Sequence, residues 1–148
     1  MRIRIAIALA ACCGIAAADT IDAPTPRAHL RGTARVSGSI TRDAAYPAHL
    51  YTARHDGFAR IVLATTSTDP HANHGHAWRK YLRVVSGTNA HRRGDGWSTN
   101  GRGDRAELLV RVHAGDELTI VATLAENVAK GVPAATADYA LAVTEEAP

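Results

Sequence analysis

From residue 32 onward, apolar side chains recur at every second position, which is the period of a half-buried β-strand. The segment 34–40 places Val36, Gly38 and Ile40 on one face and polar side chains on the other. Six further segments share this alternation: 49–54, 58–67, 80–86, 106–113, 117–125 and 137–145. Turns containing Gly, Pro or Asp separate them. The pattern predicts an all-β protein, a jelly-roll-like β-sandwich of seven to eight mostly antiparallel strands.

Local turn and helix signals add two expectations. His55-Asp56-Gly57 stands between the segments 49–54 and 58–67, and an Asp-Gly pair at such a place favours a β-hairpin. A helical pattern over ten or more residues is missing after the leader. The one short candidate, 124–130, is cut off by Gly131 and Pro133.

The first 18 residues have the composition of an export signal. Arg2 and Arg4 precede an uncharged run over 5–18, and Ala16 and Ala18 are the small residues that signal peptidase requires. The run is shorter than the ~20 residues that span a membrane. We therefore assign 1–18 to a signal peptide, 19–31 to a flexible linker with two prolines, and 32–146 to the sandwich domain.

A second processing route fits the same leader. Leu9-Ala10-Ala11-Cys12 is similar to the lipobox of bacterial lipoproteins, in which Cys12 becomes the lipidated N-terminus. Either route exports the protein, to the periplasm, to the outer membrane through a lipid anchor, or outside the cell. Cys12 and Cys13 are the only cysteines, so the domain has neither a disulfide nor a thiol nucleophile.

Charge and motifs argue against two function classes. Without Arg2 and Arg4 the domain and linker hold 15 basic and 14 acidic residues, a balance that gives no reason to expect nucleic-acid binding. The sequence contains no Gly-x-Ser-x-Gly elbow, no His-Glu-x-x-His helix and no phosphate-binding loop. We expect a monomer that is not an enzyme and that meets the membrane only through a lipid anchor, if it carries one.

The densest group of polar side chains is Asp69-Pro70-His71-Ala72-Asn73-His74-Gly75-His76. Imidazole and carboxylate groups at this spacing are ligands for zinc or copper, so His71, His74, His76 and Asp69 form one candidate metal site. A solvated loop between two strands explains the same residues without a metal. Such loops seldom hold a metal tightly unless other groups orient the ligands.

Aromatic side chains supply the remaining candidates for ligand contact. Trp78 and Tyr81 stand at the start of one predicted strand, and Trp97 lies in the long Gly-rich segment 87–105. Each could stack on a glycan or peptide, or pack against the rim of the sandwich. In the same segment Asp95 and Asp104 are donors for calcium, but neighbouring arginines oppose a dication.

Three stretches resemble the bacterial pre-peptidase C-terminal domain, a jelly-roll-like sandwich found on exported proteins. They are 49–63, with its strand, Gly turn and apolar strand; 112–118, with Ala114-Gly115-Asp116; and 138–143, where Tyr139 precedes alternating apolar residues. The resemblance covers about 32–144. It implies an accessory or binding domain, here without a catalytic domain before it.

These observations predict an exported, non-catalytic β-sandwich module that binds a protein or glycan of the cell envelope through the loops at one end. One alternative is a periplasmic metal-binding protein or small metalloenzyme centred on His71, His74 and His76. Another is a structural envelope lipoprotein.

Overall fold

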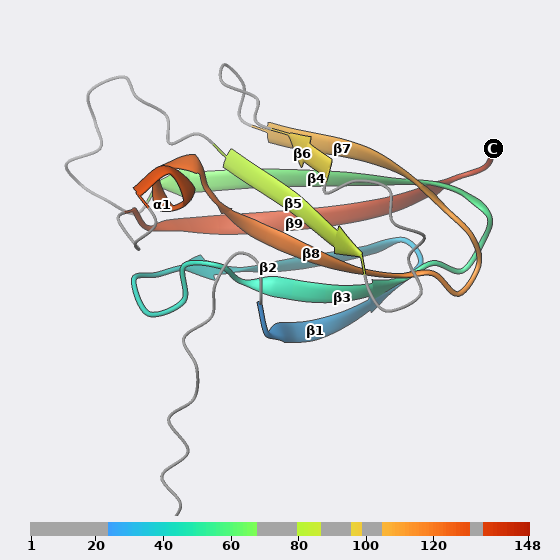
Figure 1. The fold of residues 1–148 in the computed structure, drawn as a ribbon, viewed down its shortest axis with the longest axis horizontal. Coiled ribbons are helices and arrows are strands. Elements are labelled where there is room, and N and C mark those ends of the chain that lie inside the picture. The colour runs from blue at the N-terminus through green and yellow to red at the C-terminus, as the bar shows by residue number, and fades with distance from the viewer. Residues whose placement is uncertain (1–23, 68–79, 87–95, 99–104, 131–134) are drawn as a thin grey trace, which may run out of the picture.

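The computed structural model describes residues 24–67, 80–86, 96–98, 105–130 and 135–148, which form a two-layered sandwich (Figure 1). One sheet has five strands in the order β1-β3-β8-β5-β6, and the other has four in the order β2-β9-β4-β7. The strands of the first sheet are β1 (Pro26–Arg31), β3 (Ala48–Thr52), β8 (Glu117–Leu124), β5 (Lys80–Ser86) and β6 (Gly96–Ser98). Those of the second are β2 (Ala34–Ile40), β9 (Ala137–Glu146), β4 (Gly57–Ser67) and β7 (Arg105–Val112).

The core lies between the two sheets, and it follows the alternation in the sequence. Ile61 and Leu63 of β4 and Leu141 of β9 are fully buried from one side, and Leu82 and Ile120 meet them from the other. The residues between them on β4 and β9 are half-buried or exposed. The predicted all-β sandwich is thus confirmed, with every ladder antiparallel except that of β1 with β3, which is parallel.

Two expectations about local structure were wrong. The segment assigned to a linker contains β1, because residues 26–31 pair with β3 and bury Leu30 at the edge of the five-stranded sheet. The hairpin expected at His55-Asp56-Gly57 does not form. The strands on either side of that turn, β3 and β4, belong to different sheets, so the turn carries the chain from one layer to the other.

The helical candidate does form one short helix, α1 (Ala125–Lys130). The side chain of Asn127, fully buried, accepts a hydrogen bond from the Ala135 amide at 2.8 Å and donates one to the Ala135 carbonyl at 3.2 Å. α1 is the only helix in the described ranges, and it is too short to cross a membrane.

Segment 41–47 covers part of the outer face of the five-stranded sheet. The Thr123 hydroxyl donates to the Ala45 carbonyl at 2.5 Å, and the Tyr46 hydroxyl donates to the Asn127 carbonyl of α1 at 3.1 Å. Ala45 and Tyr46 also pack with Val121. Val121 and Thr123 point outward from β8 and yet are fully buried, because this segment lies over them.

Two polar pairs join the sheets inside the sandwich. His49 of β3 is 2% exposed, and its Nε2 lies 2.8 Å from the Tyr139 hydroxyl of β9. Two residues along β3, the Tyr51 hydroxyl donates to a Glu145 carboxylate oxygen at 2.6 Å. Gly38 lies beneath Tyr139: a Cβ there would come within 2.9 Å of its hydroxyl oxygen, so the ring occupies space that any larger residue at position 38 would take.

Burial governs the ionisation of these pairs. Desolvation, together with the charge of nearby Arg27, lowers the pKa of His49, so the imidazole is held in its neutral form. Desolvation is also the first cause that raises the pKa of Tyr139 and of Tyr51; for Tyr51 the contact with Glu145 adds to it. The buried side chains His49, Tyr51 and Tyr139 are therefore held in their neutral forms between the sheets, where they contribute to packing.

Candidate binding site

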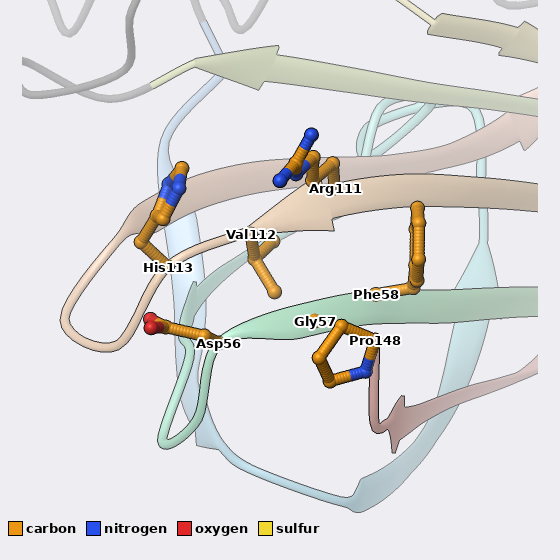
Figure 2. Close-up of a pocket in the computed structure, with 7 residues that line it drawn as sticks. All are labelled: Asp56, Gly57, Phe58, Arg111, Val112, His113 and Pro148. Carbon is orange, nitrogen blue, oxygen red and sulfur yellow. The ribbon is translucent and has the colours of Figure 1, made fainter.

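A depression of about 480 Å³ opens at the end of the sandwich where β4 begins and β7 ends (Figure 2). A volume of this size falls within the ~300–1,000 Å³ that ligand pockets occupy. Three elements line it: the start of β4 with the turn before it, the end of β7 with the turn after it, and the C-terminal residue. The lining residues are Asp56, Gly57, Phe58, Arg111, Val112, His113 and Pro148.

Two aspartates hold the turns at this end in place. Asp56 accepts a hydrogen bond from the Ala114 amide at 2.8 Å, which ties the turn before β4 to the turn after β7. Asp116 accepts one from the His113 amide, also at 2.8 Å, within the second turn. Both carboxylates are therefore engaged by backbone donors. They fix the shape of the rim.

Gly57 lets the last residues of the chain approach β4. Its φ of 142° is a conformation that favours glycine, and a Cβ at this position would lie 2.2 Å from the Glu146 carbonyl oxygen and 3.3 Å from the Pro148 nitrogen. A side chain here would push the end of β9 away from β4. Pro148 lines the depression because residue 57 has no side chain.

Arg111 is the cation of this site that has no counterion. It is exposed on β7 directly opposite Phe58 of β4, and among the described residues no acidic side chain lies within ion-pair distance of it. Arg60, two residues along β4, contacts both Glu107 and Glu146 instead. The hydrogen bond from Arg60 is the first cause that lowers the pKa of Glu146. Both glutamates are thus engaged by Arg60, whereas Arg111 is exposed and makes no ion pair with a described residue.

The apolar surface continues from the depression onto the outer face of the four-stranded sheet. Leu109 lies two residues before Arg111 on β7 and is 52% exposed. It is the only exposed large hydrophobic side chain in the described ranges. In the ladder it stands opposite Arg60, so Phe58 is its diagonal neighbour on the same face. Phe58 itself is half-buried.

His113 adds a further polar group to the rim. Its ring is exposed, and its Nδ1 lies 3.6 Å from an Asp116 oxygen. Taken together, the site offers an unpaired guanidinium and an imidazole above a floor of Phe58, Val112 and Pro148. Such an arrangement can hold an anionic group that is attached to an apolar one. Among the lining residues, no nucleophile stands beside a base.

Of the sequence-predicted contact residues, only Tyr81 has a described side chain, and it does not line this depression. Tyr81 is half-buried on β5, in the other sheet, opposite Thr123. Trp97 lies on β6 opposite Arg83, and its side chain is outside what the structure describes. Trp78 is outside the described residues altogether, as are Cys12 and the whole leader.

The metal hypothesis also concerns residues beyond the description. Asp69, His71, His74 and His76 lie in the gap between β4 and β5. The described ranges themselves contain no group of three or more His, Cys, Asp or Glu side chains that could hold a metal ion. A zinc or copper site on the His segment therefore stays a prediction.

The alternation over 106–113 puts Leu109, Arg111 and His113 on one face of the strand, but the sequence analysis did not recognise a site there. The available signal was Leu109 itself, an apolar residue at a position where the alternation calls for a polar one. Phe58 and Pro148 gave no such signal. Their proximity to Arg111 depends on how β4, β7 and the chain end meet in three dimensions.

No protein-family model matches the sequence, and no curated protein matches it. Among solved structures, the chain is similar to the pre-peptidase C-terminal domain of a collagenase from Bacillus anthracis, with a TM-score of 0.57 and 9% identity over 81% of this chain and 97% of that one. The protein has a pre-peptidase C-terminal-like fold. This confirms the fold that the three sequence stretches implied.

A second likeness is more distant than the pre-peptidase C-terminal fold. The chain is similar to PliG, a periplasmic inhibitor of g-type lysozyme, from Aeromonas hydrophila, with a TM-score of 0.43 and 14% identity over 82% of this chain and all of that one. PliG from Salmonella Typhimurium gives a TM-score of 0.40 and 12% identity over 81% of this chain and all of that one.

Proposed function

We propose that this protein is an exported, non-catalytic binding module that holds a protein partner of the cell envelope. The observation that carries the proposal is the surface formed by the depression together with Leu109 and Arg111. We call it the β4/β7 surface. It presents an exposed apolar side chain beside a cation that has no counterion among the described residues, on an outer sheet face that no described segment covers. Exposed apolar area of this kind is typical of interaction sites.

Export is supported by the leader and by the fold. Arg2, Arg4 and the uncharged run that follows have the pattern of a signal peptide. The domain of the Bacillus anthracis collagenase provides a precedent for this fold as one part of a larger protein. In our proposal the present chain plays an accessory role and binds its partner non-covalently.

Site-specific photo-cross-linking in intact cells tests the binding role. A photoreactive phenylalanine analogue replaces Leu109 on the β4/β7 surface or, as the matched control, Arg31, which is exposed on β1 of the other sheet. We expect one discrete adduct from position 109 and none from position 31. The same adducts from both positions, or none from either, would contradict the proposal.

Cell fractionation of the same strains tests export separately. The protein should be recovered outside the cytoplasm, with a shortened N-terminus that mass spectrometry of the purified chain can define. Cleavage after Ala18 indicates ordinary secretion, and a lipid-modified Cys12 indicates an anchor. An intact Met1–Arg4 sequence in the cytoplasmic fraction would overturn the export part of the proposal.

A further inference from the structure

The chemistry of the β4/β7 surface specifies a class of partner, and the inference rests on the proposed binding function. We propose that this surface binds an extended polypeptide segment with an acidic side chain flanked, two residues away on each side, by apolar side chains. The acidic group meets Arg111, one apolar side chain meets Leu109, and the other enters the depression. Three features of the surface support this assignment: its charge, its spacing and its apolar lining.

The charged side chains of the β4/β7 surface indicate the charge of the ligand. Arg111 is exposed and has no acidic partner in the described part of the chain, whereas Arg60 already contacts Glu107 and Glu146. Asp56 and Asp116 are held by backbone amides. These two carboxylates keep their negative charge, but each already accepts a hydrogen bond from the turns of the protein. Arg111 is the charged side chain at the depression that has no hydrogen-bond or ion-pair partner among the described residues, and a guanidinium binds a carboxylate through two parallel hydrogen bonds.

Spacing sets the form of the ligand. Leu109 and Arg111 stand on the same face of β7, two residues apart, and the depression, which Arg111 itself lines, extends past the end of β7 to His113. Positions two residues apart in a strand are separated by ~6.7 Å. An extended peptide presents alternate side chains at this same interval. A partner that runs along the outer face of β7 therefore places one apolar side chain over Leu109, an acidic side chain over Arg111 and a second apolar side chain over the depression.

Apolar contacts complete the match. Phe58, Val112 and Pro148 line the depression, and Leu109 supplies the exposed contact on the other side of Arg111. A glycan is favoured by an exposed aromatic face on which a sugar can stack. Phe58 is half-buried, so its ring does not offer such an exposed face. The one exposed large apolar side chain in the described ranges is Leu109. The surface thus fits a peptide better than a sugar.

Nuclear magnetic resonance titration of the purified, isotope-labelled protein tests the inference. The probe is the peptide acetyl-Gly-Leu-Ser-Glu-Ser-Leu-Gly-amide, and its matched control carries Gln in place of Glu. We expect the Glu peptide to shift the amide resonances of Phe58, Leu109 and Arg111, and to bind about tenfold more tightly than the Gln peptide, because a charge-assisted hydrogen bond is lost in the control. Raising the salt concentration should weaken the Glu peptide alone.

Two variants locate the contact. Arg111→Gln should bind the Glu peptide about tenfold more weakly, whereas Arg35→Gln, which removes an exposed cation from β2 on the same face, should bind it normally. Far-ultraviolet circular dichroism shows that each variant is folded. Equal affinity for the two peptides, no binding of either, or an unchanged affinity in Arg111→Gln would overturn the inference.

The remaining outcomes separate this inference from the proposed function. Resonance shifts that follow protein concentration rather than peptide would identify a second copy as the occupant and overturn the peptide assignment. Tighter binding of an acidic oligosaccharide than of the Glu peptide would overturn it in favour of a glycan. If the cross-linker at position 109 still traps a partner in cells, the binding function stands and only the partner chemistry is wrong. If both experiments fail, both proposals fall.

Discussion

On the five-stranded sheet, the outward side chains Val121 and Thr123 are fully buried, whereas on the four-stranded sheet the outward Leu109 is 52% exposed. The first face lies under residues 41–47, which bond to β8 and to α1. Among the described residues, nothing equivalent lies over β4 and β7. The two outer faces belong to the same domain, but one has become part of the core and the other meets solvent.

The difference between the covered and the exposed outer face is also visible in the sequences of the strands. β8 carries apolar or small side chains on both faces over 120–124, as expected for a strand that is buried on both sides. β7 and β9 keep the alternation of a strand with one wet face. An exposed leucine in an otherwise alternating strand therefore stands out, because every other large apolar side chain whose burial the structure describes is buried or half-buried.

The largest expected effect comes from placing the same charge on each face. Val121→Asp puts a carboxylate under the 41–47 segment without a partner, and we expect a loss of more than about 4 kcal/mol in the free energy of unfolding, or failure to fold. Leu109→Asp puts it in water and should change stability by less than about 0.5 kcal/mol. Chemical denaturation monitored by circular dichroism measures both.

Similar losses of unfolding free energy in Val121→Asp and Leu109→Asp would contradict the difference between the two outer faces. Equal destabilisation would mean that Leu109 is packed, and the β4/β7 surface would no longer be available to a partner. If Val121→Asp is tolerated, the 41–47 segment opens easily, and the five-stranded sheet would offer a second accessible face.

The second-largest expected effect concerns Asn127 of α1, the helix to which segment 41–47 is hydrogen-bonded. Asn127 is fully buried, and its amide group both donates to and accepts from the backbone of Ala135. Asn127→Ala leaves two buried backbone groups without partners, and we expect a loss of about 2–4 kcal/mol. Asn127→Asp keeps the acceptor but buries a carboxylate against the Ala135 carbonyl oxygen, and we expect it to lose at least as much stability as Asn127→Ala. A loss below about 0.5 kcal/mol in Asn127→Ala would show that water replaces the side chain.

The sandwich was predictable from sequence because alternation is a local property that each strand displays by itself. Ile61, Leu63 and Leu141 were expected inside and are buried. Which strands pair with one another, in contrast, is not a local property of the sequence. The Asp56-Gly57 turn has the sequence of a hairpin turn, but β3 and β4 bury their apolar faces against one another across the core, and so the chain changes sheet at that point.

The site was less predictable for the same reason. Its members come from residues 56–58, 111–113 and 148, and only the fold brings them together. β1 was missed because Pro26 and the charged residues around it lower strand propensity, while its parallel pairing with β3 supplies the order that the segment lacks by itself. The sequence signal that did point outward, Leu109, became meaningful once the burial of its neighbours was known.

The interior between the two sheets contains a buried ionisable side chain, the imidazole of His49. Burial lowers the pKa of His49 from its ordinary value of 6.5, so the folded state binds fewer protons at this residue than the unfolded state does. The contribution of His49 is therefore constant well above pH 6.5 and is lost as the pH falls through and below that value. We expect at most about 1.4 kcal/mol of lost stability per pH unit below 6.5.

Unfolding midpoints measured at pH 7.5, 6.5 and 5.5 check this, with His49→Gln and His55→Gln compared with the parent. His55 is exposed in the turn before β4, so its replacement should leave the pH dependence as it is. His49→Gln should reduce the dependence over this range, whatever its own cost in stability. A parent protein equally stable at all three pH values would show that the sheets accommodate the imidazolium, for example through Tyr139 and the unpaired Nδ1.

The smallest expected effect concerns the hydrogen bond by which Tyr46 holds segment 41–47 to α1. Tyr46→Phe removes the hydroxyl that donates to the Asn127 carbonyl at 3.1 Å but keeps the ring packed on Val121, and we expect a loss of about 1 kcal/mol. The acceptor is a backbone oxygen, so it survives in Asn127→Ala. In the double variant the two losses should therefore add to within about 0.5 kcal/mol. Strong coupling between them would mean that the Asn127 side chain positions the carbonyl that Tyr46 uses, and that segment 41–47, α1 and Ala135 loosen as a single unit.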